Sequence, residues 1–405
     1  MTDTHHQILI IGGGNAGIVA AAQLFRHHKD LDIGIVEPAE YHYYQPAWTL
    51  VGAGTYHAEE TYRPMRDVMP PRATWIQDSV TEVDPDEQFA TTNSGTTIAY
   101  DYLVVAPGIQ INWDGIKGLP ETITTNGVCS NYKYEYAPYT WEALREFRGG
   151  KMLFTQPSTP IKCGGAPQKI MYLAEEYIRN HGLRPKSEVH FYTPGTVIFG
   201  VEFFAKTLRS ILEERDIQDH YGYDLQEIKG DEKKAVFRKT SDGETTTEEV
   251  DFDLIHVVPP MSAPDFVRKS KLAVQEGDSK GWVDVDHQTL QHNRYPNVFS
   301  LGDVAALPTA KTGSAIRKQS PVMIYYLLKE MGKKTPPGDA PIYKGYSSCP
   351  LVTGYGKMVL AEFDYNNDPM PTFPFDQSEQ RYDMWILKKF GLPWMYWNLM
   401  LQGKA

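Results

Sequence analysis

The chain has 405 residues, of which 41% are hydrophobic and 22% charged, so a large core is available and wholesale disorder is excluded. Its 40 Lys and Arg residues stand against 51 Asp and Glu residues, and the resulting net charge of −11 disfavours nucleic acid as a partner. No run of 18 apolar residues occurs, which excludes a membrane-spanning helix. Three cysteines are too few for a secreted disulfide scaffold, and no signal or transit peptide is expected.

The beginning of the chain has the order of a dinucleotide-binding unit. Residues 7–11 are continuously apolar, which predicts a strand buried on both faces of a parallel sheet. The strand leads into a turn with Gly-x-Gly-x-x-Gly spacing. In such a turn Gly12 permits the tight bend, Gly14 lets the backbone approach a pyrophosphate, and Gly17 allows helix and strand to pack closely.

A helix from Ile18 to about Arg26 and a strand over residues 32–36 are predicted next. The helix N-terminus, preceded by Asn15 and Ala16, offers N–H groups to the pyrophosphate, and Glu37 can accept hydrogen bonds from ribose hydroxyls. A glycine-rich turn without a ligand is the alternative. Strand, glycines, helix, strand and acid in this order favour a dinucleotide site, although the glycines alone do not separate FAD from NAD.

Two later segments favour FAD. One is the apolar strand that ends at Pro107-Gly108, and the other is the strand over residues 297–301 that ends at Gly302-Asp303. Both resemble signatures of flavoproteins with two dinucleotide-binding domains. The resemblance implies that Asp303 binds the ribityl chain and that a helix from Thr312 to about Met331 points its N-terminus at the flavin. A ligand-free N-cap is the alternative for Asp303.

A second nucleotide-binding unit is expected in such proteins, but its fingerprint is missing. The strand over residues 188–193 is followed by Pro194 and Gly195, and only Gly200 remains beyond them. Bulky side chains would then meet the pyrophosphate where bare backbone is required. A nicotinamide reductant is therefore disfavoured, and the second domain is expected to serve as scaffold.

Two of the three cysteines lie in settings that suit redox chemistry. Cys163 precedes a predicted helix and is flanked by Lys162 and Lys169, which favour a thiolate. Cys349 lies in a turn-rich segment before Pro350. A buried, unreactive thiol is the alternative for each, and a separation of 186 residues says nothing about contact.

Several longer stretches resemble sulfide:quinone oxidoreductases, and most closely the mitochondrial type. They are residues 161–173, 281–286, 348–355, 360–365 and 372–378. The resemblance implies that hydrosulfide attacks a redox-active Cys163–Cys349 bridge and that two electrons pass through a flavin C4a adduct to FAD and on to ubiquinone or menaquinone. It also implies that sulfane sulfur leaves to a thiol such as glutathione, to sulfite or to a growing polysulfide. Bacterial members often have a further cysteine near Cys129, which is here either a helper in sulfur transfer or a buried residue.

Reduction of a quinone requires access to lipid. Residues 385–401 are aromatic-rich and contain Lys388 and Lys389, which predicts a helix in the membrane interface with the lysines at anionic headgroups. A helix packed on the core or in a dimer interface is the alternative. The predicted quinone-pocket walls are Tyr355, Phe373, Phe375 and Trp385, and the protein is expected to be peripheral and monotopic, on the inner mitochondrial membrane or the cytoplasmic side of a bacterial one.

The predicted fold is α/β with two Rossmann-like domains and a small membrane-facing region. An FAD-binding domain is expected over residues 1–113 and 282–335, a second domain over 114–281, and the C-terminal region over 336–405. Lys311 is the preferred cofactor-side cation, ahead of Arg317 and Lys318, and no metal-ligand spacing is found. Three alternative functions stay open: the flavin subunit of a sulfide-oxidising flavocytochrome, a type II NADH:quinone oxidoreductase and a non-catalytic flavin-binding protein. The oligomeric state, including a homodimer, is also open.

Overall fold

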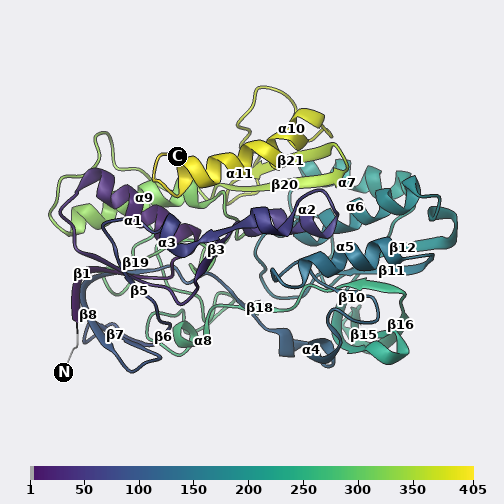
Figure 1. Cartoon of the computed structure of the whole chain (residues 1–405), viewed down its shortest axis with the longest axis horizontal. Helices are drawn as coiled ribbons and strands as arrows, with labels where there is room; N and C mark the ends of the chain where they lie inside the picture. Colours follow the sequence, from purple (N-terminus) through teal and green to yellow (C-terminus); the bar gives the residue numbers. More distant parts are fainter. Residues whose placement is uncertain (1–3) are drawn as a thin grey trace.

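A computed structural model describes residues 4–405 and places two largely parallel sheets at opposite ends of an elongated molecule (Figure 1). The first sheet has the order β5-β2-β1-β8, with β19 also beside β8, and β7 and β6 continue it in antiparallel fashion. Its strands are β1 (Thr4–Ile11), β2 (Ile33–Val36), β5 (Thr74–Ile76), β6 (Val80–Asp84), β7 (Phe89–Thr92), β8 (Thr97–Val105) and β19 (Val298–Ser300). The order confirms an α/β fold, because the strand nearest the N-terminus lies in the middle of the sheet.

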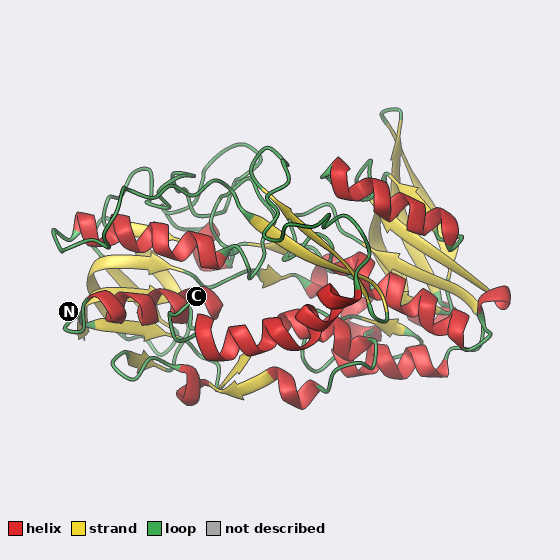
Figure 2. Ribbon diagram, turned by 90° about the horizontal axis from the view of Figure 1, so that it is seen from above, coloured by secondary structure: helices red, strands yellow, loops and turns green. Residues whose placement is uncertain are grey.

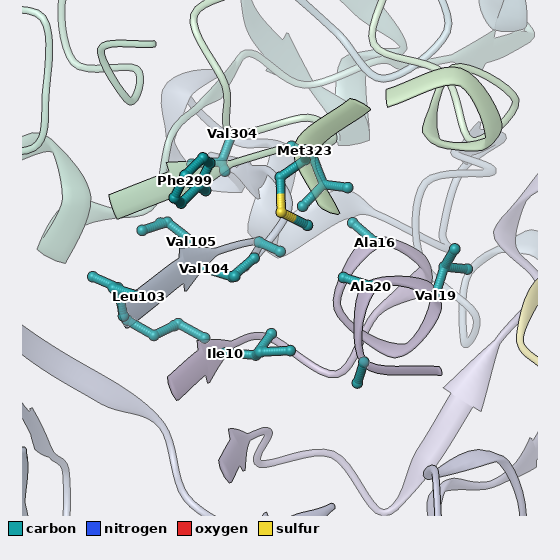
Figure 3. Packing of buried hydrophobic residues seen from close by; sticks show 14 of the residues in the cluster. Ile10, Ala16, Val19, Ala20, Leu103, Val104, Val105, Phe299, Val304 and Met323 are labelled. Carbon is teal, nitrogen blue, oxygen red and sulfur yellow. The ribbon is translucent and has the colours of Figure 1, made fainter. Parts of the chain in front are cut away.

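The core of this half forms where two helices cover the central strands. Helix α1 (Asn15–His27) packs beside α9 (Ile316–Glu330); α1 lies against β1, and α9 lies against β19. Figure 3 shows Ile10, Val104, Ala20 and Met323 meeting in this layer, and all four are buried. The two predicted helices and the apolar strand over residues 7–11 are confirmed, although the strand begins earlier, at Thr4.

The second sheet has the order β10-β17-β11-β12-β13, and all of its strands are parallel. These strands are β10 (Val128–Cys129), β11 (Gly150–Thr155), β12 (Ser187–Thr193), β13 (Gln218–Tyr221) and β17 (Leu254–His256). Helices α5 (Ala137–Glu146), α6 (Ala166–Asn180) and α7 (Glu202–Glu214) lie in the same half. An antiparallel sheet of β14 (Tyr223–Lys229), β15 (Lys234–Ser241) and β16 (Glu244–Asp251) is attached, and its outer strand, β16, is mostly exposed.

The C-terminal region extends along both halves. Strands β20 (Ser347–Gly354) and β21 (Lys357–Phe363) form a hairpin that packs on α6. A helical run over residues 382–400 then lies along the top of the molecule in Figure 1 and faces the viewer in Figure 2. It consists of α10 (Tyr382–Ile386), α11 (Leu392–Met395) and two π-helical segments, Leu387–Gly391 and Tyr396–Met400. In the part of the chain from residue 4 onward, no helix is both long and apolar enough to cross a bilayer.

Packing joins part of the predicted second domain to the first core. Ala263, Val267 and Leu272 are buried in the same cluster as β1 and β8, although they precede the expected boundary at residue 282. The remaining elements are short: α2 (Trp48–Gly52), α3 (Met65–Val68), α4 (Leu119–Thr122), α8 (Asp265–Arg268), and the pairs β3 (Tyr41–Tyr43) with β4 (Tyr62–Pro64) and β9 (Gln110–Ile111) with β18 (Met261–Ser262).

Candidate active site

One cavity of about 420 Å³ extends from the first glycine-rich turn to Cys163. Its walls come from the carboxyl ends of β1 and β8, the segment after β19, the N-terminus of α9 and the C-terminal helical run. The predicted cofactor-side residues that line it are Gly14, Asn15, Ala16, Glu37, Pro107, Gly108, Gly302, Asp303 and Lys311. Ligands of open α/β sheets bind at this edge, beyond the carboxyl ends of the strands.

Each glycine of the first turn is required for a different structural reason. Gly12 has a φ of 102°, and a Cβ there would lie 2.4 Å from the carbonyl oxygen of Ala106. A Cβ on Gly17 would lie 1.9 Å from the carbonyl oxygen of Gly12, so only glycine lets α1 approach β1. Both lie behind the cavity rather than on its surface. A Cβ on Gly14 would meet nothing within 4 Å, which leaves the space in front of the α1 N-terminus free for a pyrophosphate.

Glu37 holds the turn in place. Its carboxylate accepts hydrogen bonds from the backbone N–H of Gly13 at 2.7 Å and of Ala39 at 2.8 Å. Burial raises the pKa of Glu37, and these two hydrogen bonds oppose the rise. Asn15 donates to the carbonyl of Gly313 at 3.2 Å, and its buried Oδ1 has no partner. The cavity wall therefore contains an unsatisfied polar atom next to the space in front of α1.

Asp303 and Lys311 line the same cavity, and the Gly302–Asp303 turn lies beside Ala16 at the start of α1. The Lys311 ammonium donates to the backbone carbonyls of Asp303 at 2.6 Å and Ala305 at 3.1 Å, and lies 3.8 Å from the ring centroid of Trp282. Burial lowers the pKa of Lys311 to about 8 and raises that of the Asp303 carboxyl. Lys311 thus fixes the backbone of the Gly302–Asp303 turn and leaves the carboxylate of Asp303 available to a ligand.

The structure brings Cys163 and Cys349 together although 186 residues separate them in sequence. Cys163 precedes α6, and Cys349 lies on β20, which packs on that helix. A hydrogen bond joins the two thiols, and the Lys169 ammonium donates to Cys163 Sγ at 3.3 Å. The bond from Cys349 and the charge of Lys169 hold the pKa of Cys163 well below its usual range, whereas the same bond and burial raise that of Cys349 well above it.

The expectation that Lys388 contacts lipid headgroups is wrong. Its side chain is only 2% exposed, lines the cavity and donates to the carbonyl of Pro46 at 2.8 Å. Burial and the neighbouring Lys169 lower the pKa of Lys388 to about 7, and Cys163 opposes that change. The π-helical turn that contains Lys388 directs it inward, whereas Lys389 remains at the surface. Which of the two neighbouring lysines faces the cavity can be decided only when the rotation of the helix about its axis is known.

Comparisons with known proteins agree with this geometry. Residues 6–138 match the family model described as pyridine nucleotide-disulphide oxidoreductase. The chain is 46% identical to the mitochondrial sulfide:quinone oxidoreductase of Mus musculus, over 98% of this chain and 87% of that one, and 44% identical to the Dictyostelium discoideum protein of the same name, over 98% and 86%. The chain belongs to the sulfide:quinone oxidoreductase family. The crystal structure of the Aquifex aeolicus sulfide:quinone oxidoreductase has the same fold, with a TM-score of 0.75 at 22% identity over 98% of this chain and 92% of that one.

Membership of this family makes FAD the cofactor, and the cavity fits it. The open space at Gly14, the free Oδ1 of Asn15 and the Asp303 carboxylate lie along one wall, as a dinucleotide with a ribityl chain requires. The N-terminus of α9, with Thr312, Gly313 and Ser314 before it, also opens onto this cavity. A helix N-terminus there favours negative charge on the bound group.

The four aromatic residues predicted for the quinone pocket are not among the lining residues of this cavity. Trp385 is buried in the second core, Phe373 and Phe375 stack on each other, and the Tyr355 hydroxyl donates to the carbonyl of Ala53 at 3.0 Å. A second cavity, of about 680 Å³, lies between residues 55–68 and the C-terminal helical run; it too contains none of the four.

Cys129 is not among the residues that line the cavity. It is fully buried, its thiol donates to the carbonyl of Ile255 at 3.4 Å, and burial raises its pKa to about 12. The cavity residues that the sequence did not assign to the site include His42, Asn131, Tyr132 and His256. Among residues 4–405, no group of three or more His, Cys, Asp or Glu residues is arranged to hold a metal ion.

Proposed function

We propose that this chain oxidises hydrogen sulfide at the Cys163–Cys349 pair, transfers the electrons to FAD and reduces a quinone. The observation that carries the proposal is the contact between two distant thiols at one end of the flavin cavity, with the Lys169 ammonium on Cys163. The relatives from Mus musculus and Dictyostelium discoideum are named sulfide:quinone oxidoreductases. A structural pair of buried thiols would not need a cation at one sulfur.

The unequal settings of the two thiols assign them different roles. In the oxidised enzyme the cysteines are joined as a disulfide, and hydrosulfide attacks it at Cys349. Cys163 then leaves as a thiolate, because thiols of lower pKa leave faster, and Lys169 stabilises its charge. Cys349 keeps the incoming sulfur as a persulfide, and Cys163, which lines the cavity, faces the cofactor.

The cycle closes when sulfane sulfur passes to an acceptor such as glutathione or sulfite. That transfer returns Cys349 to a thiol, because its pKa is raised, and reformation of the Cys163–Cys349 bond releases two electrons and the proton of Cys349. FAD, held by the residues that line the cavity, would supply the two-electron acceptor between the thiols and the quinone. The Cys349 thiol is held against Cys163, so the bond can form again without a large rearrangement.

The C-terminal helical run supports peripheral attachment to a membrane. Tyr382, Ile386, Phe390 and Trp394 recur every four residues and are all exposed, between 38% and 67%. The opposite face of the same run, with Lys388, Leu392, Tyr396 and Met400, lines the flavin cavity. A quinone, ubiquinone or menaquinone, would thus enter from the lipid next to the flavin. We infer that the protein is monotopic. The names of its relatives contain the word mitochondrial, which favours the inner mitochondrial membrane; in a bacterium the protein would lie on the cytoplasmic side of the membrane.

Anaerobic stopped-flow spectroscopy of the purified FAD-loaded protein tests the proposal. Sulfide should bleach the flavin rapidly, and replacement of Cys163 or Cys349 by Ser should abolish the bleaching while FAD stays bound. NADH, mixed in parallel, should leave the flavin oxidised, because residues 194–201 lack the glycines of a second pyrophosphate site. Bleaching by NADH but not by sulfide would overturn the proposal in favour of an NADH:quinone oxidoreductase.

A further inference from the structure

Three buried polar side chains at the thiol end of the cavity have unpaired hydrogen-bonding atoms. They are the amide of Asn131, the hydroxyl of Tyr132 and Nδ1 of His256. The three residues line the same cavity as Cys163, and each is more than nine-tenths buried. Buried polar groups without partners are rare, and an unpaired one costs about 1–3 kcal/mol. Three together indicate a ligand that forms these hydrogen bonds.

The hydrogen bonds of His256 define which of its ring nitrogens donates. The backbone N–H of Asn131 donates to Nε2 at 3.0 Å, so Nε2 is the unprotonated nitrogen. Burial lowers the pKa of His256 to about 3, and the ring is therefore neutral with its proton on Nδ1. The carbonyl of His256 itself is near enough to oppose the fall of the pKa, but no other described residue accepts a hydrogen bond from that N–H. His256 consequently offers one donor to the cavity.

Tyr132 places the donor set beside the thiols. Its ring packs in one cluster with Ile161 and Ala166, which lie on either side of Cys163 in the chain. The thiol groups of Cys163 and Cys349 are close enough to raise the pKa of the Tyr132 hydroxyl, together with burial, which is the larger cause. The hydroxyl stays protonated and is a second neutral donor.

The cations of this region are already engaged elsewhere. Lys169 donates to Cys163, Lys388 to the carbonyl of Pro46, and Lys162 to Oε1 of Gln45 at 2.7 Å. They make the region electropositive, while the unpaired donors are neutral. A small anion fits this combination, because the cations attract it and the neutral donors can bind it without forming a tight ion pair.

We propose that Asn131, Tyr132 and His256 form the binding subsite of a small sulfur anion next to Cys163. The inference rests on the proposed function, and the shared ligand chemistry is that of hydrosulfide, as the substrate, or of sulfite, as the sulfur acceptor. Each is an anion small enough for the end of the cavity, and each must reach the sulfur that the cysteines carry. The three residues bind and orient this anion; they transfer no electrons.

The test compares Tyr132→Phe and Asn131→Asp with a matched control. Tyr132→Phe removes one donor, and Asn131→Asp introduces a negative charge that repels an anion at nearly constant shape. The control is Tyr100→Phe, which removes another buried, unpaired hydroxyl, one that lies in the first core away from this cavity. Rates of flavin reduction are measured against sulfide concentration, and turnover is measured against sulfite concentration at saturating sulfide.

Each cavity variant should lower the second-order rate constant for one anion by about tenfold, which is the effect of one hydrogen bond to a charged ligand. A loss confined to the sulfide series identifies hydrosulfide, and a loss confined to the sulfite series identifies the acceptor. Tyr100→Phe should change neither. The inference is overturned if both series stay unchanged, or if the variants instead lose FAD, measured as flavin released per protein, because the atoms would then contact the cofactor. In either case, bleaching by saturating sulfide that still depends on Cys163 would leave the proposed function intact.

Discussion

The Lys169 ammonium lies 3.3 Å from the sulfur of Cys163, although Lys169 is almost fully buried one turn into α6. The contact follows from the geometry of the helix start. Cys163 has a φ of 86°, and its carbonyl accepts a hydrogen bond from the N–H of Ala166 at 2.6 Å. This turn bends the chain back, so that the first inward-facing lysine of α6 covers the thiol.

Replacement of Lys169 by Met should raise the pKa of Cys163, because the hydrogen bond and the positive charge on its sulfur are lost while the bond from Cys349 remains. A thiol of higher pKa is a poorer leaving group, so flavin reduction by sulfide should slow by about threefold at neutral pH for each unit of change, because Brønsted slopes in thiol–disulfide exchange are about one half. The pH dependence of flavin reduction, measured by stopped flow, should move to higher pH. Lys206→Met, which changes an exposed lysine of α7, should leave the profile in place. An unmoved profile in Lys169→Met would remove the lysine from the chemistry.

Replacement of Lys388 by Met should stabilise the folded protein while it impairs sulfide oxidation. The pKa of Lys388 is about 7 in the folded state against an ordinary 10.5, so between these values the unfolded chain binds more protons and stability rises with pH. The burial penalty is therefore complete below about pH 7 and vanishes toward pH 10.5. The Met variant should melt about 5 °C higher at pH 6.5, and its advantage should shrink as the pH rises to 10. A difference in melting temperature that stays constant with pH would show that the lowered pKa of Lys388 does not cause the effect.

Sequence reasoning located the first half of the site because that half is local in sequence. Gly12, Gly14 and Gly17 occur in one turn between a strand and a helix. Their spacing reflects local backbone sterics, so it can be recognised in the sequence alone. The first strand and the helix after it also followed from this local pattern, although the strand begins earlier, at Thr4, whereas the helix before Met331 was implied by the family resemblance. The role of each glycine is then visible in the close approach of its missing Cβ.

The thiol half was not predictable from local pattern. Contact between Cys163 and Cys349 depends on how β20 packs on α6, and the resemblance to a family, not the spacing, suggested it. Lys388 was assigned to the lipid side because an ordinary interfacial helix was expected, whereas the π-helical turn shifts the phase and directs it inward. Asn131 and His256 have no motif; they matter only because the ends of β10 and β17 meet beside the cavity.

Cys129 should be dispensable for sulfide oxidation. Its thiol is buried with a pKa of about 12 and bonds to the Ile255 carbonyl, so it is neither ionised nor accessible at neutral pH. Cys129→Ala should retain flavin bleaching by sulfide within about twofold, and the removal of one sulfur from the core should cost about 1 kcal/mol in the free energy of unfolding. In the reduced native protein, iodoacetamide should label Cys163 and leave Cys129 unmodified. Loss of bleaching in Cys129→Ala would restore this cysteine to the mechanism.

Gly14 and Gly17 should respond in opposite ways to an added side chain. A Cβ on Gly14 meets nothing within 4 Å in the protein, so Gly14→Val should leave the apoprotein as stable as the parent but should lower its affinity for FAD by at least tenfold, because the side chain occupies the pyrophosphate space. Gly17→Ala places a Cβ 1.9 Å from the Gly12 carbonyl oxygen and should destabilise the protein itself. FAD titration and thermal melting of the two apoproteins separate these effects. Full FAD affinity in Gly14→Val would place the pyrophosphate elsewhere.

The exposed aromatic residues of the C-terminal run should anchor the protein to vesicles. Phe390 and Trp394 are 57% and 59% exposed on the face opposite to the flavin cavity, and insertion of each ring into the interface should contribute about 1.5–3 kcal/mol. The double variant Phe390→Ser/Trp394→Ser should therefore bind phosphatidylcholine vesicles at least tenfold more weakly in a sedimentation assay. It should still reduce a water-soluble short-chain quinone. Phe203→Ser removes an aromatic ring of similar exposure from α7, in the other half of the molecule, and should sediment with vesicles as the parent does. Equal binding by the double variant and the parent would mean that another surface meets the lipid.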